Sequence, residues 1–176
     1  MLKKLTLFIL IALSIVSCDY FSKYPGYSKT KSGIYYKLIK FGESTKKPKS
    51  GDYITADIIY KTINDSVFFE GRRKLQINKP AFEGAIDECF FMLAEDERAE
   101  FIISANTFFT KTLETSLPDF FTEEDLMLVD IDIVDIQTED DYVREKEAFL
   151  NWIEDFGEYE RVILRQYIDQ EKIDIE

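Results

Sequence analysis

The clearest periodic pattern in this 176-residue chain is Leu126-Met127-Leu128-Val129-Asp130-Ile131-Asp132-Ile133-Val134-Asp135-Ile136. Apolar and acidic side chains alternate along it with a period of two, which is typical of an antiparallel strand with one buried and one solvated face. The three aspartates also resemble a metal-binding cluster, but at this spacing the solvated face of a strand is the favoured interpretation. The segment therefore predicts a sheet-forming domain.

Further strands are predicted upstream of this segment. Alternating or clustered apolar residues, bounded by turn residues, occur in five stretches: Gly33–Phe41, Tyr53–Lys61, Val67–Phe69, Lys74–Asn78 and Arg98–Ser104. After Pro80, a run with helical spacing comprises Phe82, Ile86, Cys89, Phe90 and Leu93. Residues 105–124 are expected to form a long irregular loop, which in a compact domain is usually functional.

The pattern changes to that of a helix after residue 138. Apolar residues from Phe149 to Tyr167 recur at the spacing i, i+3, i+4, i+7 of an amphipathic helix. One helix cannot bury such a stripe by itself, so the stripe is expected to pack on the rest of the chain or on a partner. We predict an α+β protein with a C-terminal helical extension over residues 138–176.

The N-terminal segment is typical of a secretory signal. Lys3 and Lys4 precede an apolar run, Leu5 to Val16, which is shorter than the roughly 20 residues that span a membrane. The run ends in Ile15-Val16-Ser17-Cys18, which resembles a bacterial lipobox. The alternative is an ordinary signal peptide with an incidental cysteine.

The lipobox predicts that the mature protein is anchored to a membrane by a lipid. We expect residues 1–17 to be removed, Cys18 to carry a lipid, and residues 18–32 to form a polar tether. The protein would then be anchored in the bacterial cell envelope, on the outer membrane and facing the periplasm.

Charge is distributed unevenly along the chain. The net charge of −12 argues against a general nucleic-acid binder. Residues 138–176 carry thirteen acids against five bases, whereas residues 20–51 contain eight lysines and a single acid, Glu43. This basic segment would either lie against anionic lipid headgroups or remain a solvated tether, and the sequence favours neither.

The composition also limits the chemistry that is available. The chain contains no histidine, which excludes a Ser-His-Asp triad, a Cys-His pair and histidine-ligated metal sites. With Cys18 lipidated, Cys89 alone remains, so neither an intrachain disulfide nor a cysteine zinc site is expected. We expect no cofactor and no metal.

The order of the elements and the residues that fill them resemble the FKBP-type peptidyl-prolyl isomerases, over roughly residues 32–137. The stretches that carry the resemblance are Ser32-Gly33-Ile34-Tyr35-Tyr36, Lys49-Ser50-Gly51-Asp52-Tyr53-Ile54, Asp65-Ser66-Val67-Phe68, Phe82-Glu83-Gly84 with Met92, Arg98 to Ser104, Leu117-Pro118 and Val134-Asp135-Ile136. The chain is most similar to divergent FKBP-like lipoproteins of Bacteroidetes type. The resemblance implies a curled antiparallel sheet of five or six strands around a short helix, over residues 33–137.

The resemblance also implies an apolar pocket for a proline-containing polypeptide. Its catalytic residues would be Phe68, Phe82 and Phe109. Its substrate-binding residues would be Ile58, Phe69, Leu75, Ala81, Ala85, Leu117 and Val129. Several polar groups of the family are replaced, because Ile58 and Phe109 stand where tyrosines are usual and Phe69 stands where the pocket aspartate is usual.

Two functions are consistent with this sequence. The first is a lipid-anchored prolyl isomerase or chaperone for extracytoplasmic proteins, with weak or lost catalysis. The second is a non-catalytic accessory subunit of an outer-membrane protein complex related to secretion or gliding motility, with the C-terminal helix as its partner face. In a third interpretation the aromatic residues only pack a core and leave no open pocket.

Overall fold

The computed structural model describes residues 23–171. The predicted signal peptide and the lipidation site Cys18 lie outside the described residues. The chain separates into two compact units, one ending at Ile136 and the other beginning at Gln137. Of the helices in the described region, none is long and apolar enough to cross a membrane.

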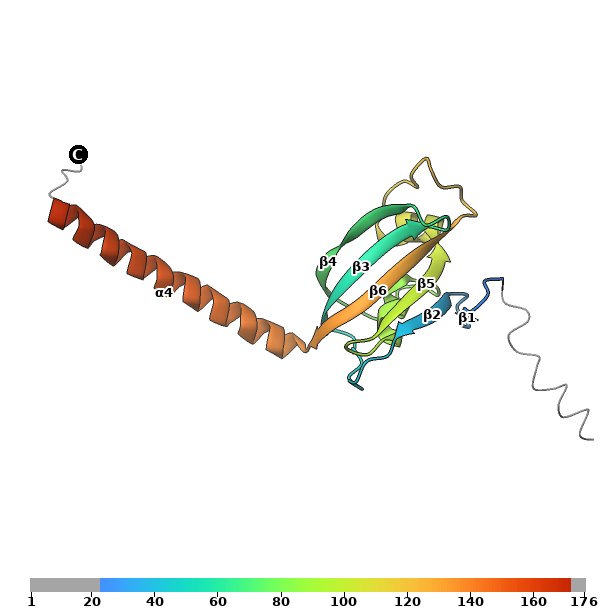
Figure 1. The fold of residues 1–176 in the computed structure, drawn as a ribbon, viewed down its shortest axis with the longest axis horizontal. Coiled ribbons are helices and arrows are strands. Elements are labelled where there is room, and N and C mark those ends of the chain that lie inside the picture. The colour runs from blue at the N-terminus through green and yellow to red at the C-terminus, as the bar shows by residue number, and fades with distance from the viewer. Residues whose placement is uncertain (1–22, 172–176) are drawn as a thin grey trace, which may run out of the picture. The chain divides into compact units, whose positions relative to one another are not determined.

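The first unit combines a sheet with short helices. Its strands are β1 (Ser28–Lys29), β2 (Tyr35–Lys40), β3 (Tyr53–Thr62), β4 (Val67–Gln76), β5 (Arg98–Ser104) and β6 (Leu126–Gln137). Its helices are α2 (Ile86–Met92), α3 (Ala105–Thr107) and the π-helical turn η1 (Phe108–Thr112). The strands form one six-stranded sheet in the order β1-β2-β5-β6-β3-β4, and the registered pairs are antiparallel (Figure 1).

The core lies between the inner face of the sheet and α2. Alternate residues of β6 point inward, and Val129, Ile131 and Ile133 are fully buried. Cys89 and Phe90 of α2 belong to the same core cluster. Burial raises the pKa of the Cys89 thiol far above its usual range, so this cysteine acts as a small apolar side chain.

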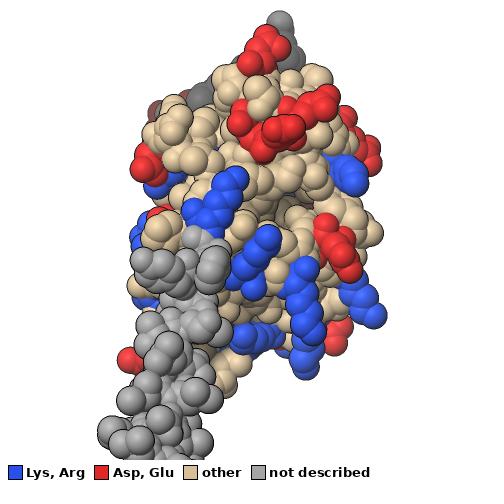
Figure 2. Space-filling model, turned by 90° about the vertical axis from the view of Figure 1, so that its right-hand side faces the viewer, with Lys and Arg blue, Asp and Glu red and all other residues tan. Residues whose placement is uncertain are grey.

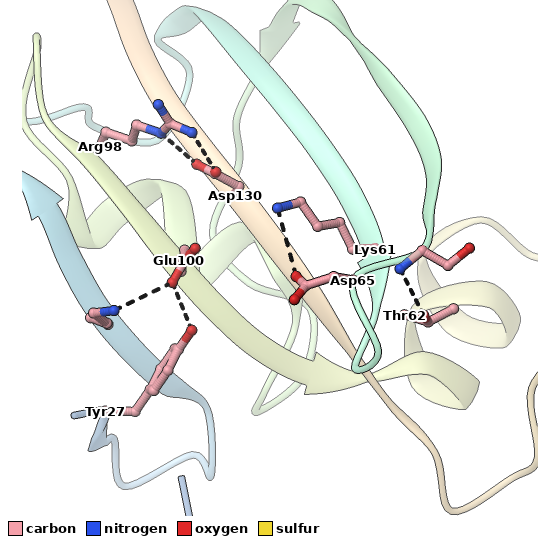
Figure 3. A network of polar contacts seen from close by, with 9 residues as sticks. Tyr27, Lys61, Thr62, Asp65, Arg98, Glu100 and Asp130 are labelled. Atoms are coloured by element: carbon pink, nitrogen blue, oxygen red, sulfur yellow. Dashed lines mark hydrogen bonds and ion pairs between the residues drawn. The ribbon is translucent and has the colours of Figure 1, made fainter. Parts of the chain in front are cut away.

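The outer face of the sheet carries a network of polar contacts, shown in Figure 3. Arg98 holds Asp130 through two hydrogen bonds of 2.9 and 2.6 Å, and Asp130 is only 4% exposed. The expectation of a solvated aspartate is therefore wrong at this position, because the Arg98 side chain covers the carboxylate. The Tyr27 hydroxyl donates to Glu100 on the same face, at 2.7 Å.

The α+β prediction is confirmed, and several elements differ from expectation in their extent. The two short strands expected at residues 67–69 and 74–78 form one continuous strand, β4. The inner helix begins at Ile86, so Phe82 lies in the turn before it. The stretch over residues 105–124 is helical up to Thr112 and irregular only after that residue.

Part of the segment expected to be a tether belongs to the sheet. Ser28 and Lys29 form the edge strand β1, in which Lys29 is paired with Tyr35 of β2. The Ile34 amide donates to the Thr30 hydroxyl at 3.1 Å and so closes the turn between the two strands. Residues 28–32 are therefore fixed on the domain.

The second unit contains one helix, α4 (Glu139–Glu171), of 33 residues. Thr138 begins it, since its hydroxyl accepts the Asp141 amide at 3.2 Å and donates to the Asp141 carboxylate. Along α4 the rings of Phe149, Trp152 and Phe156 stack in sequence, with centroids 6.0 and 5.7 Å apart. All three side chains are exposed.

Candidate functional site: an aromatic cluster beside the inner helix

Seven aromatic side chains form a continuous cluster in the first unit, which we call the aromatic cluster. Its members are Tyr60, Phe68, Phe69, Phe108, Phe109, Phe120 and Phe121. They come from β3, β4, η1 and the loop before β6, so separate parts of the sequence meet here. Neighbouring ring centroids lie between 4.8 and 6.2 Å apart, the range for favourable aromatic pairs.

Strand register places the first rings of the cluster. Tyr60 of β3 lies directly opposite Phe69 of β4, so both side chains point to the same face of the sheet, and their centroids are 5.0 Å apart. Phe108 of η1 covers Tyr60 at 5.0 Å in an edge-to-face arrangement. The cluster therefore joins the sheet to the segment that follows β5.

The interior of the cluster is filled by its own side chains. Phe109 is 9% exposed and Phe121 is 7% exposed, and their centroids are 5.9 Å apart. Phe68 contacts both rings and is itself half-buried. A bound side chain would therefore sit on the partly exposed rings or displace one of them.

The predicted site residues occupy three different environments. Ile58, Ala85 and Val129 are buried in the core, with at most 2% exposure. Phe68, Phe69, Leu75 and Leu117 are half-buried and pack against that core. Phe82 is half-buried in the turn before α2, and Ala81 is exposed. The structure thus brings Phe68, Phe69 and Phe109 together, and a role for any of them in substrate binding stays a prediction.

Tyr60 is a member of the cluster that sequence reasoning missed. It lies two residues after Ile58 on the same face of β3. Its hydroxyl donates no hydrogen bond to any residue in the described region, and burial raises its pKa to about 12. The neutral hydroxyl is therefore a donor without a partner beside an apolar surface.

The turn before α2 offers a second such donor. Glu88 fixes this turn by accepting the Gly84 amide at 2.7 Å and a hydrogen bond from the Ser32 hydroxyl. The Phe82 carbonyl accepts the Ala85 amide at 3.3 Å, whereas the Phe82 amide donates to no group among residues 23–171. The resemblance to the FKBP-type family assigns this N–H to the substrate carbonyl that precedes the proline, and that role stays a prediction.

Two cations lie over rings of the predicted site. The Arg73 guanidinium is 4.8 Å from the centroid of Phe69, and the Lys111 ammonium is 5.3 Å from that of Phe82. Neither forms an ion pair with an acid in the described part of the chain. The arrangement combines apolar rings, two free donors and positive charge, and it contains no nucleophile paired with a base.

Comparison with solved structures identifies the fold. FkpA from Escherichia coli superposes with a TM-score of 0.54 and 13% identity, over 68% of this chain and 55% of FkpA. A peptidyl-prolyl cis-trans isomerase from Pseudomonas syringae pv. tomato superposes with a TM-score of 0.51 and 9% identity, over 66% of this chain and 84% of that protein. The fold is FKBP-like.

At these identities the likeness extends to the FKBP-like fold alone. No protein-family model matches the sequence, and no curated protein is significantly similar to it. The matched region spans little more than half of FkpA.

Proposed function

We propose that this protein is a lipid-anchored FKBP-type prolyl isomerase or chaperone that acts on extracytoplasmic polypeptides with weak catalysis. The observation that carries the proposal is the pair of unpartnered donors, the Tyr60 hydroxyl and the Phe82 amide, on an FKBP-like domain with an aromatic cluster. Both donors lie near α2, since Phe82 precedes that helix and Tyr60 packs against the core that contains Cys89 and Phe90 of α2.

These groups suit a reaction that needs no proton transfer. Rotation about an Xaa-Pro bond is slow because amide resonance gives a barrier of about 18–20 kcal/mol. An apolar surface favours the twisted amide, which has less charge separation than the planar one. Donors such as Tyr60 and Phe82 would hold the carbonyls on either side of the proline. Catalysis is expected to be weak because Phe69 and Phe109 bring rings but no polar groups.

Peptide titration tests binding at this site. We would add a proline-containing peptide to ¹⁵N-labelled protein comprising residues 18–176, which retains every described element, and record amide chemical shifts. The largest changes are expected at the Phe82 amide and around Tyr60 and Phe69. Shifts confined to other parts of the domain, or no shifts at a millimolar excess of peptide, would contradict the proposal.

Lipid anchoring is proposed from the lipobox and has its own test. A bacterial host expressing the full chain would be labelled with an alkyne fatty acid, alongside a Cys18→Ser variant. We expect label and outer-membrane fractionation in the parent chain, and loss of both in the variant. Label retained by the Cys18→Ser variant would show that another residue is modified.

The accessory-subunit function remains the second candidate, and α4 is the observation that favours it. Its exposed aromatic stripe, which includes Phe149, Trp152 and Phe156, offers a surface to a membrane protein complex. Under this function, Trp152→Ala should reduce recovery of that complex after crosslinking in cells and leave peptide binding at the aromatic cluster unchanged. The opposite result would favour the isomerase.

A further inference from the structure

Lysine and tyrosine side chains gather on the outer face of the sheet at the edge formed by β1 and β2. We call this surface the lysine–tyrosine face. It comprises Lys23, Tyr24, Tyr27, Lys29, Tyr35 and Lys37. Figure 2 looks at the side of the domain on which β1 and β2 lie in Figure 1, and shows basic side chains gathered there while acidic side chains lie mainly along the upper rim.

Strand pairing and ring contacts hold this face together. Lys29 lies opposite Tyr35 across the β1–β2 pair, and its ammonium is 4.9 Å from the centre of that ring. Lys23 and Lys37 lie over Tyr24 and Tyr27, at 5.6 and 5.7 Å. Each lysine ammonium therefore lies over an aromatic ring.

The positive charge of the face is largely uncompensated. Lys23 and Lys29 form no ion pair with any residue of the described chain, and the same holds for the adjacent Lys31. Lys37 is 4.0 Å from Glu100, but that carboxylate also accepts the Tyr27 hydroxyl at 2.7 Å (Figure 3). On a protein with a net charge of −12, this is a segregated basic surface.

Two large exposed apolar side chains lie further along the chain from Tyr35 and Lys37, at the end of β2. Phe41, just beyond the end of β2, is 81% exposed, and Ile39 in that strand is 44% exposed. Tyrosines at the water boundary, lysines that reach outward and an exposed phenylalanine are the composition of surfaces that lie in the headgroup region of a bilayer.

We propose that the lysine–tyrosine face binds the surface of a membrane that contains anionic lipid headgroups. The lysines would contact lipid phosphates, and Phe41 would enter the boundary between headgroups and acyl chains. Lys23 and Tyr24 line a hollow together with Phe120 and Phe121 of the aromatic cluster, so the two surfaces adjoin there. The proposed contact with lipid does not depend on isomerase activity. If Cys18 is lipidated, the five residues to Lys23 span at most about 18 Å, which would keep the face close to the headgroups.

Vesicle sedimentation tests the proposal. Unlipidated protein comprising residues 18–176 would be spun with phosphatidylcholine vesicles that either lack or contain about one third phosphatidylglycerol. Binding is expected only to the anionic vesicles and should fall as salt is raised from about 0.05 to about 0.5 M. Equal binding to both kinds of vesicle would overturn the proposal.

Matched variants locate the binding surface. The triple variant Lys23→Gln, Lys29→Gln, Lys31→Gln should lose about fivefold in partitioning for each lysine, or on the order of 100-fold in total. The control triple Lys61→Gln, Lys111→Gln, Lys146→Gln removes the same charge from β3, η1 and α4, and should lose less than about threefold. Circular dichroism would verify that both triple variants are folded.

Three further outcomes would overturn the proposal. Binding retained by the first triple variant, or lost equally in both, would assign it to another surface such as α4 or to net charge alone. Displacement of the protein from vesicles by soluble polyglutamate at equal charge concentration would point to an acidic protein partner instead of lipid.

Discussion

The Tyr60→Phe substitution tests whether the Tyr60 hydroxyl stabilises the fold or is free to bind a substrate. The change removes a group that has no hydrogen-bond partner in the described chain, and it keeps the ring contacts with Phe69 and Phe108. A typical hydrogen bond contributes about 0.5–1.5 kcal/mol, and none is lost here. We therefore expect the free energy of unfolding at pH 7 to change by less than about 0.5 kcal/mol.

The same variant should behave differently at alkaline pH. Burial raises the pKa of Tyr60 to about 12 in the folded protein, against about 10 in the unfolded chain. As pH rises above 10, the unfolded chain releases its proton first, so the folded state loses stability between pH 10 and 12. Two pKa units correspond to at most about 2.7 kcal/mol. The Tyr60→Phe variant lacks this loss and should become the more stable protein above pH 11.

Urea unfolding followed by near-ultraviolet circular dichroism at pH 7, 9 and 11.5 would measure both effects. Tyr27→Phe is the matched control, because the Tyr27 hydroxyl donates to Glu100 at 2.7 Å. We expect that control to lose about 1 kcal/mol at pH 7. A loss above 1 kcal/mol in Tyr60→Phe at pH 7, or parallel pH profiles of parent and variant, would refute the interpretation of Tyr60 as a half-buried donor without a partner in the described chain.

Four further substitutions test the packing and the ion pair of the sheet. Phe68→Ala removes a half-buried ring with neighbours at 5.7–6.2 Å and should cost about 2–3 kcal/mol in urea unfolding, so its effect on activity must be corrected for stability. Arg98→Met leaves the nearly buried Asp130 carboxylate unpaired and should cost about 2–3 kcal/mol, with much of that loss recovered when Asp130→Asn is added. Gly42→Ala would place a methyl group 2.5 Å from a main-chain carbonyl oxygen and should lower the melting temperature. In Gly157→Ala the added methyl group meets no atom within 4 Å, so this substitution should stabilise α4 by about 1 kcal/mol.

Period-two patterns were sufficient to predict most of the sheet. β5 and β6 were predicted with nearly their observed bounds, because each alternates between a buried and an outer face. β4 was predicted in two pieces because Glu70 to Arg73 interrupt its apolar pattern. The structure shows why a strand tolerates them, since Arg72 pairs with Asp57 of the neighbouring strand β3 at 2.7 Å and Arg73 lies over Phe69.

The site was less predictable because it depends on contacts between distant segments. Phe68, Phe69 and Phe109 were identified through the family resemblance. The sequence around Phe120 and Phe121 gave no indication that these two rings would pack against them. Tyr60 was missed because the family resemblance placed the usual pocket tyrosine at residue 58, where this chain has isoleucine. Counting along the buried face of β3 would have found it, since every second residue of that strand points inward.

The burial of the Asp130 carboxylate could not be predicted from the alternating pattern of β6. The period of two placed its side chain correctly on the outer face of the sheet. Only the cross-strand geometry shows that Arg98 reaches from β5 to bind it and remove it from water. The burial of a charge thus depended on a partner that the local sequence did not indicate.

Prolyl cis/trans exchange in a peptide, measured by NMR, tests the central claim most directly. Protein comprising residues 18–176 would be added in catalytic amount, with Tyr60→Phe as the variant that keeps the fold. We expect accelerated exchange that falls about tenfold or more in Tyr60→Phe, since one oriented donor is lost at the reacting amide. No acceleration by a folded protein would contradict the isomerase function and favour the accessory subunit.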